Sequence, residues 1–164
     1  MVKRMLALCV ASWAMLSSLS AQSKPSSLQG AWRVAEVTFT GQNARIIGNP
    51  QPGMVLFTAK HYANLTSARA EPRLALPPSK VETASADELR AAWNPFTANA
   101  GTYEMTGDTL TTKVIVAKNQ NAMNVHAFQV YSVKLQGGTL TLVQKANEAG
   151  PIANPTTIKL ARME

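Results

Sequence analysis

The chain has 164 residues, of which 46% are hydrophobic and 15% are charged, with a formal net charge of +7. This length predicts one domain that buries about two thirds of the surface of the unfolded chain. The basic residues are scattered, and the densest basic stretch, 69–80, contains Glu71 and three prolines, which argues against a nucleic-acid-binding surface.

Residues 1–21 have the pattern of a signal peptide. Lys3 and Arg4 are followed by an apolar run over 5–15 and by the small residues of a cleavage site. The apolar run is shorter than the ~20 residues that span a bilayer, so we expect cleavage near Ala21 and no permanent membrane anchor. The protein is therefore expected to be secreted or periplasmic.

Cleavage changes the chemistry of the remaining chain. The only cysteine, Cys9, leaves with the signal peptide, so disulfides cannot stabilise the mature fold. The net charge falls from +7 to +5 because Lys3 and Arg4 are removed. Residues 22–27 are polar and are expected to form a disordered leader, and residues 28–164 are expected to form the domain.

The first half of the domain predicts three strands. Residues 30–40 are rich in β-branched and aromatic side chains, and Trp32 can plug one end of a closed barrel. Residues 41–53 contain three glycines and two prolines and predict a long connection, of the kind that lies over the open mouth of a barrel. Residues 54–58 and 61–66 then predict a hairpin.

One helix is expected in the middle of the chain. Residues 67–83 are rich in proline and irregular, after which Ser85 and Glu88 have the spacing of a capping box and Pro95 marks a stop. Trp93 and Phe96 fall on one side of this short helix. That side either packs on the barrel or forms a lid whose aromatic rings touch a ligand.

The second half predicts five strands, at 102–106, 109–117, 126–136, 139–145 and 156–162, with a polar loop over 118–124. The fold class is thus all-β, an eight-stranded antiparallel barrel with one short helix inserted after the third strand. Eight strands enclose an interior that is filled by side chains or holds one small ligand, and the alternation pattern alone does not separate these cases.

The order of several short motifs resembles that of the lipocalin superfamily, and of bacterial lipocalin-like domains in particular. The motifs are Gly30-x-Trp32, the Gly-x-Tyr-Glu strand at 101–104 and Arg162 in the last strand, and the resemblance covers about 28–163. It implies a lipocalin-like β-barrel in which Trp32 lies at the closed base. Gly30 and Arg162 are its other structural residues, and the guanidinium is expected over the indole face, an arrangement worth roughly 0.5–2 kcal/mol.

The sequence does not point to a catalytic or metal-binding site. His61 and His126 have no second ligand at metal spacing, and the sequence contains no nucleophile elbow, phosphate loop or dinucleotide fingerprint. We therefore predict no cofactor and no metal. An enzyme remains an alternative, with Glu36 or Glu104 transferring protons inside the barrel.

The leading hypothesis is a secreted, non-catalytic protein that binds a small hydrophobic or amphipathic molecule in the barrel. A filled barrel that acts as a protein-interaction module is a further alternative. The hydroxyls of Tyr62 and Tyr103 are expected to orient the ligand. The predicted ligand-binding residues are Val34, Glu36, Met54, Phe57, Tyr62, Trp93, Phe96, Tyr103, Val116 and Phe128.

Overall fold

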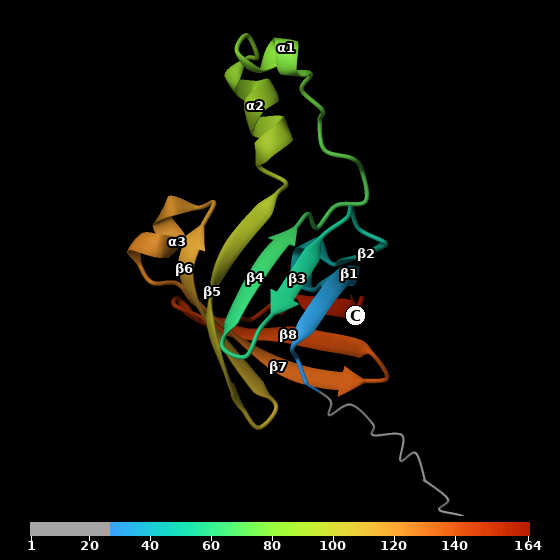
Figure 1. Ribbon diagram of the computed structural model, residues 1–164, viewed down its shortest axis with the longest axis vertical. Helices are drawn as coiled ribbons and strands as arrows, with labels where there is room; N and C mark the ends of the chain where they lie inside the picture. The colour runs from blue at the N-terminus through green and yellow to red at the C-terminus, as the bar shows by residue number, and fades with distance from the viewer. Residues whose placement is uncertain (1–26) are drawn as a thin grey trace, which may run out of the picture.

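Alternating apolar residues produce ten strands within residues 27–164, the part of the chain that the computed structural model describes (Figure 1). The predicted signal peptide and all but the last residue of the predicted leader lie outside the described residues. The strands are β1 (Gly30–Phe39), β2 (Arg45–Gly48), β3 (Met54–Phe57), β4 (His61–Thr66), β5 (Thr97–Thr106), β6 (Thr109–Ala117), β7 (Phe128–Gln136), β8 (Thr139–Asn147), β9 (Gly150–Pro151) and β10 (Thr157–Arg162). The helices are α1 (Pro78–Val81), α2 (Ala86–Trp93) and α3 (Gln120–Asn124).

Eight of these strands close into an antiparallel barrel in the order β10-β1-β3-β4-β5-β6-β7-β8, because β10 pairs with both β1 and β8. Short β2 and β9 add to this barrel by pairing with β1 and β8. Closure leaves none of the eight barrel strands at an open edge. The prediction of an eight-stranded antiparallel barrel is confirmed.

The predicted position of the single helix needs correction, because α1 and α2 follow the fourth strand, β4, and not the third. The additional strand β2 forms within 41–53, which the sequence predicts as a loop. Only residues 30–33 of β1 pair with β3, so the far half of β1 is free on that side, and β2 pairs with it from Glu36↔Gly48 to Phe39↔Arg45. Backbone donors and acceptors in this half of β1 are thereby satisfied.

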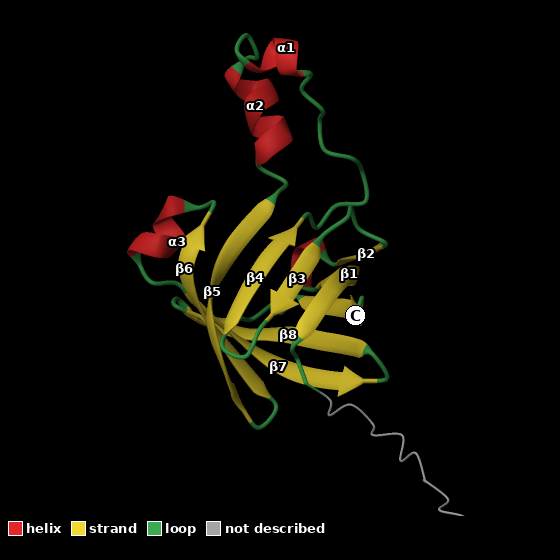
Figure 2. Cartoon of the chain, in the orientation of Figure 1, coloured by secondary structure: helices red, strands yellow, loops and turns green. Residues whose placement is uncertain are grey.

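The helices lie outside the barrel wall at the end where β4 ends and β5 begins (Figure 2). Ser85 and Glu88 form the predicted capping box at the start of α2, with the Glu88 carboxylate accepting from the Ser85 amide at 2.8 Å. Residues 120–124, expected in a polar loop, form α3, because the Asn119 side chain accepts from the Asn121 amide and caps it. Within 27–164 no helix is long and apolar enough to span a membrane.

The core seals the opposite end of the barrel. Trp32 is fully buried, and its indole N–H donates to the carbonyl of Leu28 at 2.8 Å. The guanidinium carbon of Arg162 lies 4.1 Å from the centre of the Trp32 ring, the contact expected from the sequence. Arg162 also donates to the carbonyls of Gln29 and Ser27 at 2.8 and 2.6 Å. This end of the barrel is therefore a closed base.

The barrel pairing contains three β-bulges, in β1, β6 and β8, and the first two change the side of the wall on which predicted residues lie. In β1 the pairing with β10 passes from Val34↔Leu160 to Glu36↔Lys159, so Ala35 is the extra residue. In β6 the pairing with β5 passes from Gly101↔Val114 to Ala100↔Val116. A bulge shifts the alternation by one residue, so that even-numbered residues face inward on one side of it and odd-numbered residues on the other.

Candidate functional site

The barrel encloses a cavity of about 610 Å³. Its lining reaches the ends of the strands opposite Trp32, through Phe39, Thr66, Thr97 and Ala117. The mouth therefore lies at the end that carries α2 and α3. Segments that border it include 66–68, 94–99 and 117–119, whereas no residue of 41–53 belongs to the lining, because β2 is part of the sheet.

One half of the cavity wall is apolar. The adjacent strands β8, β10, β1 and β3 contribute only aliphatic and aromatic side chains to it. These residues are Val34, Val37, Phe39, Val55, Phe57, Leu142, Ile158 and Leu160. A ligand that covers this wall would be stabilised by about 25 cal/mol for each Å² of apolar surface removed from water.

The other half carries the polar side chains of the strands. Here β4, β5, β6 and β7 contribute hydroxyl and amide groups among smaller apolar residues. The polar members are Tyr62, Asn64, Thr66, Thr97, Asn99, Thr112, Gln129 and Tyr131. This half can therefore exchange hydrogen bonds with a ligand.

The tyrosines of the polar half are held in their neutral form. Burial raises the pKa of Tyr131 to about 12, and the neighbouring Tyr62 adds to the effect. Burial also raises the pKa of Tyr62, and a hydrogen bond with Thr112 partly opposes this rise. Both phenols thus remain hydrogen-bond donors at neutral pH. Near the mouth, Ser67 is 4% exposed and its Oγ has no partner among the described residues.

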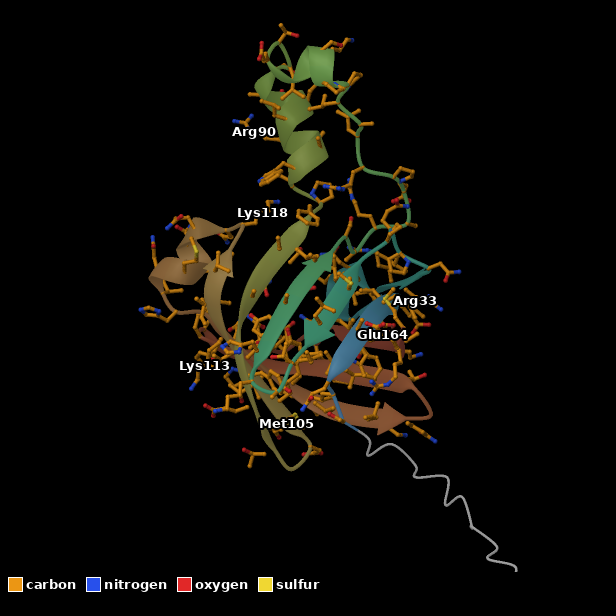
Figure 3. The ribbon with its side chains drawn as sticks, in the orientation of Figure 1. Arg33, Arg90, Met105, Lys113, Lys118 and Glu164 are labelled. Carbon is orange, nitrogen blue, oxygen red and sulfur yellow. The ribbon has the colours of Figure 1, made fainter. Side chains whose placement is uncertain are left out.

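Lys118 ties α2 to the mouth. Its ammonium donates to the carbonyls of Trp93 at 2.6 Å and Phe96 at 2.8 Å, and lies 5.2 Å from the centre of the Trp93 ring. Figure 3 shows Lys118 beside the end of α2 nearest the barrel. Among the described residues that line the cavity, only Lys118 and Glu148 are charged, and both lie at the mouth.

Four predicted ligand-binding residues lie together in the lining, namely Val34, Phe57, Tyr62 and Phe96. Val34 and Phe57 belong to the apolar half, and Tyr62 to the polar half. Phe96 lies at the mouth between α2 and β5, where the guanidinium carbon of Arg73 is 4.9 Å from its ring centre. Ligand binding by these four remains a prediction.

Bulges place two other predicted residues outside. Glu36 follows the bulge in β1, so it faces outward, where Lys159 donates to it at 2.8 Å and lowers the pKa of its carboxyl. Val116 follows the bulge in β6 and is 56% exposed. Without the bulges, alternation from Trp32 and from Thr112 would bring both residues inside.

Met54 and Phe128 fall on the outer phase of their strands. Met54 pairs with the exposed Arg33, while the next residue of β3, Val55, pairs with buried Trp32. Met54 and Phe57 are an odd number of residues apart, so a regular strand cannot turn both inward. Phe128 pairs with Lys113, whose neighbours Thr112 and Val114 line the cavity.

Tyr103 and Trp93 are the remaining predicted residues outside the lining. The Tyr103 hydroxyl donates to the carbonyl of Thr58 at 2.7 Å, and its ring packs edge-on against Phe57. Tyr103 therefore supports the β3–β4 turn and is not the expected ligand handle. Trp93 is 58% exposed and borders a groove between α2 and 72–76, because α2 has no buried residue holding it against the barrel.

The acid–base alternative loses its geometric basis. Glu104, like Glu36, is on the outside, with an exposed side chain 3.6 Å from the ammonium of Lys113. Within 27–164 no three His, Cys, Asp or Glu side chains come together to hold a metal ion.

Sequence reasoning missed the polar residues of the wall, above all Thr112, Gln129 and Tyr131. In β7 the outward set contains Phe128 and Val130, and the inward set contains Gln129 and Tyr131. Both sets mix apolar and polar residues, so hydrophobicity does not fix the phase of the strand. A usable sequence signal is the apolar residue Leu110, two positions before Thr112 in the part of β6 that precedes the bulge; Leu110 is fully buried, so Thr112 also faces inward.

The chain matches a known protein family. A family model described as a lipocalin-like domain matches residues 29–160, which spans all eight barrel strands except the last two residues of β10. A search of curated proteins gives no match.

Proposed function

Because the chain belongs to the lipocalin-like domain family, we propose that it binds a small hydrophobic or amphipathic molecule inside its barrel and carries it without chemical change. The observation that carries this proposal is the cavity of about 610 Å³, closed at the Trp32 base and open at the other end. Its volume lies within the range of small-molecule sites, and its wall combines apolar surface with a few polar groups.

We also propose that the protein is exported and acts in a secreted or periplasmic form. A charged start, a short apolar run and small residues before Gln22 support export and cleavage after Ala21. A protein without cysteine in its mature form is compatible with an oxidising compartment.

Two substitutions on one strand test binding in the cavity. Val114→Trp fills the space beside the polar wall, whereas Val116→Trp adds the same ring on the outer surface beyond the bulge. The assay is the fluorescence of the neutral apolar probe N-phenylnaphthylamine, together with native mass spectrometry of material that copurifies from the natural host.

We expect wild type and Val116→Trp to bind the probe alike and Val114→Trp to lose at least about tenfold in affinity, equivalent to about 1.4 kcal/mol. Equal binding by the two variants, with both folded by circular dichroism, would place the probe elsewhere. A wild-type protein that neither binds the probe nor copurifies with a small molecule would contradict the proposal.

A further inference from the structure

The division of the cavity wall into two halves indicates how polar and apolar groups are distributed over the surface of the ligand. The apolar strands β8, β10, β1 and β3 are consecutive around the barrel, and so are β4, β5, β6 and β7. The division therefore runs along the barrel axis. A molecule with a polar head and an apolar tail would need a different cavity, one whose wall is polar at one depth and apolar at another.

The polar half presents hydroxyl groups to the cavity, and one of them, on Tyr62, also forms a hydrogen bond with Thr112. The hydroxyls of Tyr62 and Tyr131 are both neutral at pH 7, and both line the cavity. Ser67 adds a buried Oγ without a partner among the described residues. A buried polar group without a hydrogen bond costs free energy, so an apolar ligand surface here would be unfavourable.

Among residues 27–164, none offers a counter-ion below the mouth of the cavity. The charged lining residues of this part of the chain, Lys118 and Glu148, are at the rim, and the Lys118 ammonium is already bound to the carbonyls of Trp93 and Phe96. Transfer of an unpaired ion into such a site is far more costly than transfer of a neutral polar group.

Resting on the proposed binding function, we propose that the ligand is an uncharged, facially amphipathic molecule. One face is hydrocarbon and lies against β8, β10, β1 and β3. The opposite edge carries carbonyl or hydroxyl oxygens that bind the hydroxyls of Tyr62 and Tyr131.

Three rigid, flat probes test this ligand class: fluorene, fluorenone, which carries one carbonyl oxygen on one edge, and fluorene carboxylate. Their binding is measured by equilibrium dialysis at neutral pH to wild type, Tyr62→Phe and Tyr131→Phe. Tyr103→Phe is the matched control, because its hydroxyl binds the carbonyl of Thr58 outside the lining. Each change removes one oxygen and keeps the ring, and circular dichroism verifies folding.

We expect Tyr62→Phe and Tyr131→Phe to weaken fluorenone binding about five- to tenfold each, without weakening fluorene binding. Tyr103→Phe is expected to leave both affinities unchanged. Fluorene carboxylate is expected to bind wild type at least about tenfold more weakly than fluorenone. The carbonyl stretch of bound fluorenone should shift to lower frequency in wild type and shift back in the Tyr62 and Tyr131 variants.

Equal losses for fluorene and fluorenone, no loss in either variant, or tighter binding of the carboxylate would overturn the inference. If none of the three probes binds while N-phenylnaphthylamine does, the inference fails and the proposed function stands. If wild type binds neither N-phenylnaphthylamine nor any of the three and copurifies with no small molecule, the proposed function fails, and the inference with it.

Discussion

Removal of the Arg162 side chain should destabilise the whole barrel from its base. In Arg162→Ala the guanidinium no longer covers the buried Trp32 ring, a cation–π contact worth about 1–2 kcal/mol when desolvated. The carbonyls of Gln29 and Ser27 also lose their donor, at about 0.5–1 kcal/mol each because water can replace part of the interaction. The expected loss in the free energy of unfolding is about 2–4 kcal/mol.

Urea unfolding followed by circular dichroism measures this loss. Arg33→Ala is the matched control, because Arg33 is an exposed residue on the outer phase of β1, and we expect a change below about 0.5 kcal/mol. Arg162→Lys keeps the charge but not the planar donor fork, so its loss should be intermediate. A loss below about 1 kcal/mol in Arg162→Ala, or one equal to that of Arg33→Ala, would refute this account of the base.

Two further predictions concern pH and processing. An unfolded tyrosine releases its proton near pH ~10, whereas folded Tyr131 holds it to about 12. Between these pH values the folded state binds more protons than the unfolded state, so the free energy of unfolding should fall with rising pH by up to about 1.4 kcal/mol per pH unit. In Tyr131→Phe this fall per pH unit should be smaller. An unchanged fall in the variant would exclude Tyr131 as the cause of the pH dependence. The intact mass of exported protein should correspond to a chain that begins at Gln22; a mass that includes 1–21 would exclude cleavage after Ala21.

The sequence is sufficient for the barrel because each barrel strand carries a local signal. Alternating apolar residues locate the strands, and the turn residues at 107–108 and 137–138 join two of the hairpins where expected. Trp32 and Arg162 can be paired from their order in the chain together with the family resemblance. Strand β2 carries a weaker signal, because its pairing depends on a length mismatch between β1 and β3 that appears only after folding.

The site is harder to predict than the fold, because one extra residue in a strand exchanges the inward-facing and outward-facing side chains of all residues that follow it. Gly101 lies opposite the bulge in β6, where the two strands approach closely. A Cβ atom at Gly101 would lie 1.8 Å from the carbonyl oxygen of Lys113, so the two backbones approach more closely than any other residue allows. The sequence of β6 alone does not reveal this close approach, because Gly101 belongs to the neighbouring strand β5. Val116 was therefore assigned to the wrong face, although its strand was correctly located.

The bulge in β1 has a consequence for the cavity beyond moving Glu36. After Ala35 the inward residues become Val37 and Phe39, so the upper wall of β1 stays apolar to the mouth. Had the alternation continued, Glu36 and Thr38 would face β4–β7 across the cavity and place a carboxylate in it. By turning Glu36 to Lys159 on the outside, the bulge keeps the β1 part of the wall free of polar side chains. The neutral, two-faced cavity therefore depends on a backbone irregularity as well as on the choice of side chains.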